Sequence, residues 1–135
     1  MPAIFKNQEG HPWRVSAAAY YTAEALGVLD KVHTPMFDAI HANDRKLFTE
    51  DALADFFAEH GVDPETFRKT FQSFAVQTQA NRAAEMTRRY RIPGVPAMIV
   101  NGRYRVSASQ AGDFDRMLRI VDELAAREAA RMGIE

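Results

Sequence analysis

Residues 91–106 carry the strongest β-strand pattern in the chain. Residues 97–100 form an unbroken apolar run, and residues 103–106 alternate arginines with apolar side chains. The dipeptide Asn101-Gly102 separates the two runs and favours a type I′ turn, because both residues tolerate positive φ. The pattern predicts a β-hairpin whose first strand is buried on both faces and whose second strand lies at an edge with one wet face.

Apolar residues at helical spacing follow capping residues or prolines through most of the remaining sequence. Thr49, Asp63 and Asp113 mark the starts of three of the predicted helices. A short apolar stretch at residues 2–6 is instead predicted to be a strand. The predicted long helix at residues 64–90 carries a stripe of Phe67, Phe71 and Phe74, which we interpret as core. The apolar stripe of the last helix consists of Phe114, Met117, Leu118, Val121 and Leu124. The predicted helices cover residues 13–26, 34–42, 49–60, 64–90 and a segment from residue 113 onward.

Length and composition are typical of one globular domain. The chain has 135 residues, 47% of them hydrophobic, and a formal net charge of −1. This balance gives no reason to expect a nucleic-acid partner or an anionic membrane surface. No apolar run approaches the roughly 18–20 residues that cross a bilayer, and residues 1–6 do not resemble a signal peptide. As written, the chain would therefore remain in the cytosol.

The sequence contains no cysteine. Among these residues, disulfides, thiolate catalysis, cysteine-ligated zinc and iron–sulfur clusters are therefore excluded. None of the four histidines forms an i, i+4 pair beside a carboxylate, so we predict no metal site and no cofactor. The acidic residues of the last helix are interpreted as a cap and a solvated face. No catalytic residue is assigned.

Two features beside the hairpin leave alternatives open. Arginines gather on both sides of it, and we favour a solvated helix end and a charge-protected edge strand over a site for an acidic group. A proline precedes the apolar strand, and spacing alone favours an ordinary trans Val95–Pro96 turn. The arginines are Arg88, Arg89, Arg91, Arg103 and Arg105.

Residues 94–104 (Gly-Val-Pro-Ala-Met-Ile-Val-Asn-Gly-Arg-Tyr) resemble the cis-proline loop and hairpin of the DsbA-like thiol:disulfide oxidoreductases. This is a thioredoxin-fold family with an inserted helical domain. Residues 20–28, 30–40 and 71–74 are similar to that helical domain, so the resemblance covers about residues 2–130. It implies a mostly helical α/β fold and a single domain at 1–135.

Within this fold, residues 2–6 and 92–135 would form the thioredoxin-like portion, and residues 13–91 the helical insertion and long helix. The resemblance implies that Pro96 is cis and that the main chain of Val95 binds an extended or unfolded polypeptide substrate. In the family this loop faces a Cys-x-x-Cys pair at a helix N-terminus. That pair and its central strand are missing here, so we expect an N-terminally truncated product, a fragment or a misread gene start.

The resemblance implies disulfide formation in exported proteins of the periplasm, here represented by a portion without redox-active cysteines. Whether the chain is an enzyme is therefore left open, and as given it is expected to be inactive. Two alternatives remain: a glutathione-dependent kappa-transferase or isomerase-like protein, and a redox-inert module that binds peptides or oligomerises. Because the missing strand would leave open sheet edges, we expect a homo-oligomer or a strand-exchanged dimer, without membrane insertion.

Overall fold

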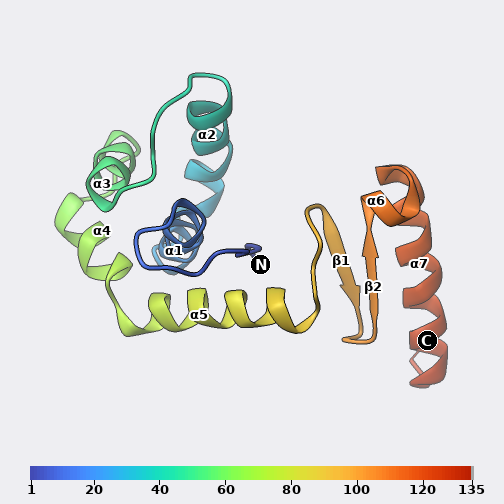
Figure 1. The fold of residues 1–135 in the computed structure, drawn as a ribbon. Coiled ribbons are helices and arrows are strands. Elements are labelled where there is room, and N and C mark those ends of the chain that lie inside the picture. Colours follow the sequence, from blue (N-terminus) through green and yellow to red (C-terminus); the bar gives the residue numbers. More distant parts are fainter. Residues whose placement is uncertain (135) are drawn as a thin grey trace. The chain divides into compact units, whose positions relative to one another are not determined.

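The computed structural model describes residues 1–134, which form seven helices and one β-hairpin (Figure 1). The chain divides into two compact units, residues 1–86 and residues 87–135. The first unit is helical, and the second contains the hairpin and the last two helices. The predicted mostly helical α/β class is confirmed. None of the helices in the described part of the chain is long and apolar enough to span a membrane.

The first unit contains four complete helices and most of a fifth. Capping side chains and prolines begin three of them, because they satisfy or avoid the free N–H groups of a first helical turn. His11 precedes Pro12 at the start of the first helix, and Thr49 and Asp63 accept hydrogen bonds at the third and fourth. The helices are α1 (Pro12–Ala25), α2 (Leu29–His41), α3 (Glu50–Glu59), α4 (Pro64–Phe71) and α5 (Phe74–Arg89).

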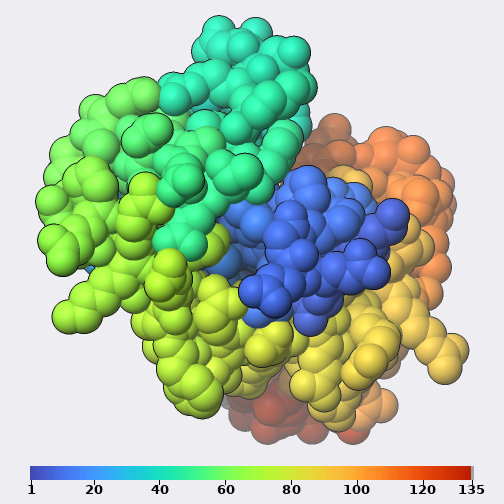
Figure 2. Space-filling model, turned by 60° about the vertical axis from the view of Figure 1, so that its left-hand side comes forward, coloured from blue at the N-terminus to red at the C-terminus, as the bar shows by residue number. Residues whose placement is uncertain are grey.

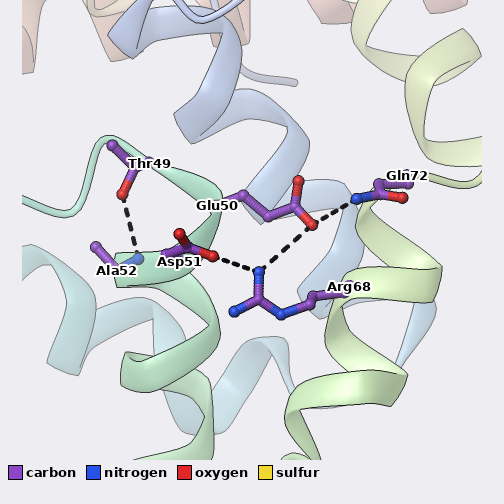
Figure 3. A network of polar contacts seen from close by, with 6 residues as sticks. All are labelled: Thr49, Glu50, Asp51, Ala52, Arg68 and Gln72. Carbon is purple, nitrogen blue, oxygen red and sulfur yellow. Dashed lines mark hydrogen bonds and ion pairs between the residues drawn. The ribbon is translucent and has the colours of Figure 1, made fainter.

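Aromatic side chains of α3 and α4 form the centre of this unit. Phe56, Phe57 and Phe67 are at most 1% exposed, and the Phe57 and Phe67 ring centroids lie 4.6 Å apart. Ion pairs add to this packing at the helix surface, where Arg68 approaches Asp51 at 2.5 Å and Glu50 at 3.8 Å (Figure 3). The burial of the rings stabilises this unit more than the ion pairs do, since exposed ion pairs contribute little stability.

Residues 2–6 do not form the predicted strand. Ile4 is instead 3% exposed and belongs to the helical core of the first unit. Arg14 of α1 holds the following segment, since it donates hydrogen bonds to Asn7 at 2.6 Å, to Asn81 at 2.6 Å and to Gln77 at 2.8 Å. Figure 2 shows this N-terminal part in blue against the yellow-green residues of α5. A short apolar stretch becomes a strand only beside another strand, and here the helices bury it instead.

The predicted start of the second helix is wrong. The second helix begins at Leu29 rather than at residue 34, and it contains Pro35 in its interior. An interior proline costs about 3 kcal/mol. The helix nevertheless continues through Pro35, because this buries Val32 and Ala39, which are 1% and 5% exposed. The predicted boundary depended on local signals alone, and core packing overrides them.

The predicted helix at residues 64–90 is two helices. Ser73 accepts a hydrogen bond from the Val76 N–H at 3.3 Å, and the Gln77 side chain donates to the Phe71 carbonyl at 2.8 Å. These side chains satisfy backbone groups at both sides of the break. The stripe prediction fails at Phe74, which is 87% exposed and therefore not part of the core.

The second unit is built on an antiparallel hairpin. Strands β1 (Ala97–Val100) and β2 (Tyr104–Ser107) pair with Val100 opposite Tyr104 and Ala97 opposite Ser107. The turn has positive φ at Asn101 and Gly102, and the Arg103 N–H donates to the Val100 carbonyl at 3.0 Å. The predicted type I′ geometry is confirmed. Helices α6 (Ala108–Ala111) and α7 (Phe114–Arg131) follow.

One face of the hairpin packs on α7, through Val106 at 6% and Met117 at 1% exposure. The prediction that the first strand is buried on both faces is wrong, because Met98 is 39% exposed. In residues 1–134 the sheet has only two strands, so β1 has no strand neighbour on its outer side. Phe114 and Leu118, predicted to be buried, are 52% and 38% exposed. The other predicted stripe residues, Met117, Val121 and Leu124, do line the buried side of α7.

Candidate functional site

The loop that leads into β1 begins with an ordered helix end. At the end of α5, the Arg91 N–H donates to the Arg88 carbonyl at 3.0 Å, and the Ile92 N–H donates to the Thr87 carbonyl at 3.1 Å. Arg91 has φ +49°, so these bonds form a Schellman motif. Glycine is the usual residue at this left-handed position, because a side chain there is disfavoured.

Arg105 of β2 attaches this helix end to the hairpin. Its Nη1 donates to the Tyr90 carbonyl at 3.0 Å and to the Arg91 carbonyl at 2.5 Å. The Tyr90 carbonyl is one of those that a helix terminus leaves without an intrahelical partner, and the Arg91 carbonyl follows directly after it. A positive side chain is also favourable at the negative end of the helix dipole. Arg105 therefore fixes the start of the loop that carries Val95 and Pro96.

Val95 and Pro96 lie exposed at the entrance to β1. Val95 is 71% exposed, and the Val95–Pro96 peptide bond is cis. The Pro96 carbonyl accepts a hydrogen bond from the Ala108 N–H at 3.4 Å, which ties this end of β1 to the start of α6. The structure thus places both predicted site residues on one exposed loop, held on one side by α6 and on the other by the Arg105 contact.

The outer edge of β1 continues from this loop. Because the Pro96 carbonyl points toward the second strand, alternation along an antiparallel ladder turns the N–H and C=O groups of Ala97 and Ile99 away from it. No strand pairs with this edge in the part of the chain that the structure describes. The loop and edge together offer backbone groups that an extended polypeptide could pair with.

A buried carboxylate holds the opposite end of the hairpin. Glu128 of α7 is 3% exposed and accepts a hydrogen bond from the Asn101 side chain at 2.8 Å. Its oxygen also lies 3.3 Å from Arg131 and 3.8 Å from Arg103. The Asn101 hydrogen bond, followed by the charges of these two arginines, lowers the pKa of the Glu128 carboxyl. The turn is thereby fixed to α7.

The sequence did not predict the roles of Arg105, Asn101 and Glu128. The partners of Arg105 lie 14 and 15 residues away, and Asn101 and Glu128 are 27 residues apart. No local pattern reports such pairs. The one available signal was the charge of Glu128 in a helix whose other acidic residues are exposed, and its position alone does not identify a partner.

The histidines take capping and surface positions. His11 accepts a hydrogen bond from the Trp13 N–H at 3.3 Å, and the His60 Nδ1 lies 2.9 Å from the Phe56 carbonyl at the end of α3. His33 and His41 are exposed on α2 beside Phe37. Within residues 1–134, no three histidine, aspartate or glutamate side chains lie together so that they could hold a metal ion.

Comparison with known proteins identifies the class of this fold. The family model of the DSBA-like thioredoxin domain matches residues 4–125, and the chain belongs to this family. It is 41% identical over 128 residues to the thiol:disulfide interchange protein DsbA of Azotobacter vinelandii, with 95% of this chain and 58% of that protein covered. It is 39% identical over 130 residues to the protein of the same name from Pseudomonas aeruginosa, with 96% and 60% covered. The chain thus spans about three fifths of these relatives' length.

Solved structures agree with this assignment. The crystal structure of Pseudomonas aeruginosa DsbA matches with a TM-score of 0.89 and 38% identity, covering 98% of this chain and 67% of that one. The oxidoreductase DsbA from Xylella fastidiosa matches with a TM-score of 0.82 and 37% identity, covering 95% and 66%. The resemblance inferred from residues 94–104 is therefore confirmed for the family.

Proposed function

We propose that these 135 residues form the substrate-binding part of a DsbA-type thiol:disulfide interchange protein. The exposed Val95–Pro96 loop carries the proposal, because it lies at the start of a strand whose outer edge has no strand partner in residues 1–134. An extended polypeptide would bind there through main-chain hydrogen bonds to Val95.

The sulfur chemistry needs groups that this sequence does not contain. Oxidation of a substrate dithiol to a disulfide reduces a second disulfide to two thiols, and the exchange proceeds by attack of a thiolate on sulfur. With no cysteine in the sequence, these residues can hold a substrate but cannot exchange electrons with it. The role that we propose for them is positioning of the polypeptide beside a redox centre supplied by other residues.

We infer that this function belongs in the periplasm, where thiol oxidation is favoured over reduction. The named relatives, which are thiol:disulfide interchange proteins, support this interpretation over the glutathione-dependent alternative. The structure of a Proteus DsbA variant in complex with a non-covalently bound peptide matches this chain with a TM-score of 0.68 at 23% identity, which supports a common fold.

Backbone-modified peptides test the binding mode. Two labelled 12-residue peptides of one sequence would carry N-methyl groups at alternate positions, one on the odd and one on the even residues. Because successive backbone groups of an extended chain point in opposite directions, one methylated peptide should bind at least about tenfold more weakly than the other and than the parent. A tenfold change corresponds to about 1.4 kcal/mol, comparable with one or two lost hydrogen bonds.

Equal affinities for the two methylated peptides would refute strand-type binding. A parallel assay should find no oxidation of a dithiol peptide and no insulin reduction above background, because no thiol is present. Turnover by the purified chain would contradict the assignment of a purely positioning role.

We also propose that the open edge of β1 pairs with a second copy when no peptide is bound, as a homo-oligomer or strand-exchanged dimer. Exposed strand edges favour such pairing, and Met98 adds an exposed apolar side chain to this edge. Light scattering should show a dimer that dissociates as the parent peptide is added. A monomer at all accessible concentrations would refute this proposal without affecting the peptide site.

A further inference from the structure

The five arginines around the hairpin divide into two groups. Arg105 donates to main-chain carbonyls, and Arg103 lies 3.8 Å from the buried Glu128 carboxylate. These two arginines therefore have structural roles within the hairpin unit. The other three, Arg88, Arg89 and Arg91, are exposed, and they take part in none of the ion pairs within residues 1–134.

Helix stability accounts for only part of this second group. Arg88 and Arg89 lie in the last turn of α5, where positive charge is favourable. Arg91 lies beyond the helix at φ +49°, where glycine or asparagine would be preferred. The backbone conformation at this position therefore does not explain the arginine, because its side chain adds a steric cost there. Its guanidinium group remains available to a ligand.

The unit as a whole is positively charged. Residues 87–135 contain nine arginines and no lysine against six aspartates and glutamates, a formal charge of +3. Residues 1–86 contain eight lysines and arginines against twelve acidic residues, a formal charge of −4. The exclusive use of arginine in the second unit suits carboxylate recognition, because the guanidinium group offers paired donors to both carboxylate oxygens.

The three arginines also lie close to the peptide loop. Val95 lies four positions after Arg91, and four residues of fully extended chain span at most about 14 Å. A bound strand advances about 3.3 Å per residue. A peptide held at Val95 therefore passes within reach of these side chains if it extends about four residues past the loop toward α5.

From these observations we propose that Arg88, Arg89 and Arg91 select polypeptide substrates that carry aspartate or glutamate beside the segment held at Val95. We call these three residues the arginine cluster. The proposal rests on the proposed function, since it assigns a substrate class to the same loop. Each exposed charge pair changes affinity by less than about fivefold, so three together should produce a preference of about tenfold.

Three labelled 12-residue peptides with one central sequence and flanks rich in aspartate, serine or lysine test this proposal. Fluorescence anisotropy at 20 mM salt should rank them in that order, with the aspartate peptide about tenfold tighter than the serine peptide. The preference should shrink to about threefold or less at 300 mM salt, because screening shortens the range of exposed charges.

A matched pair of variants separates the cluster from net charge. Arg88→Gln/Arg89→Gln/Arg91→Gln should reduce the aspartate preference to less than about twofold while the serine peptide still binds. A control triple variant removes the same charge from exposed arginines of α7 and should keep more than half of the preference. The control positions are Arg116, Arg119 and Arg127.

Several outcomes would overturn the inference. If the serine peptide binds but the aspartate peptide binds no tighter, the substrate class is wrong and the proposed function stands. If both triple variants lose the preference equally, it arises from net charge and not from the cluster. A 12-nucleotide single strand that binds more tightly than the aspartate peptide would mark the cluster as a nucleic-acid site. If no peptide of any charge binds, the proposed function fails together with the inference.

Discussion

The Arg105→Met substitution should loosen the end of α5 and the loop that follows it, while the hairpin stays paired. It removes two hydrogen bonds, to the Tyr90 carbonyl at 3.0 Å and to the Arg91 carbonyl at 2.5 Å. A hydrogen bond contributes about 0.5–1.5 kcal/mol net, and the exposure of Arg105 places each bond in the lower half of that range. We therefore expect a loss of about 1–2 kcal/mol in the stability of this loop. Methionine keeps the unbranched aliphatic stem, so the apolar contacts remain.

The amide of Ile92 is a suitable reporter, because its hydrogen bond to the Thr87 carbonyl depends on the helix end that Arg105 holds. A loss of 1–2 kcal/mol corresponds to about 5–30-fold faster opening. Amide hydrogen exchange followed by NMR should therefore show Ile92 exchanging faster by that factor. Amides in the middle of α1 should be unchanged.

Two controls define the cause of the Ile92 effect. Arg105→Lys, which offers a single ammonium group instead of a fork, should produce an intermediate rate. Arg119→Met removes an exposed arginine of α7 and should leave Ile92 unaffected. A change of less than twofold at Ile92 in a folded Arg105→Met variant would refute the role assigned to this side chain.

Three further substitutions test the core, the buried carboxylate and the turn. Phe67→Ala should lower the free energy of unfolding in urea by about 3–5 kcal/mol, because Phe67 is 0% exposed. Phe74→Ala should change it by less than about 0.5 kcal/mol, because Phe74 is 87% exposed. Similar losses in the two variants would contradict the core assignment. Because the Asn101 hydrogen bond and two arginines lower the pKa of Glu128, its stabilising contribution is complete above the usual carboxyl pKa and disappears as the pH falls through the lower folded-state value. Urea midpoints between pH 6 and pH 2.5 should therefore fall more steeply for the natural chain than for Glu128→Gln, and parallel curves would exclude the effect. Gly102→Ala should lower the unfolding free energy by about 1 kcal/mol because Gly102 has φ +67°, and an unchanged thermal midpoint would argue against the turn geometry.

Sequence patterns succeeded where the determinant is local. Asn101-Gly102 predicted the turn because positive φ is a property of these two residues themselves. Thr49, Asp63 and Asp113 marked helix starts correctly, since each cap bonds an N–H three residues later in the sequence. Such features form with the same partners in almost any tertiary context.

The errors have other causes. Thr34-Pro35 predicts a helix start by local rules, yet the helix begins at Leu29 and continues through Pro35, which buries Val32 and Ala39. Phe74 fits the spacing of the Phe67 stripe, yet the helix ends before it and a new one begins. In the first case packing in the core decides the outcome. In the second, the Ser73 and Gln77 side chains satisfy backbone groups at the break. Apolar periodicity reports neither effect.

Recognition of the loop depended on the resemblance. Spacing alone favoured an ordinary trans turn at Val95–Pro96, and only the likeness of residues 94–104 to a known family indicated a substrate loop. The side chains that hold this loop and the hairpin, Arg105 and Glu128, escaped prediction because their partners are 14–15 and 27 residues away.

The left-handed conformation of Arg91 implies a conflict between stability and substrate choice. Arg91→Gly should stabilise the end of α5 by about 1 kcal/mol, because glycine removes the steric penalty at φ +49°. The same change would remove one cation of the arginine cluster. Selection for stability alone would therefore favour glycine at position 91, and selection for acidic substrates would favour arginine. Natural sequence variation at this one position is where these two demands would become visible.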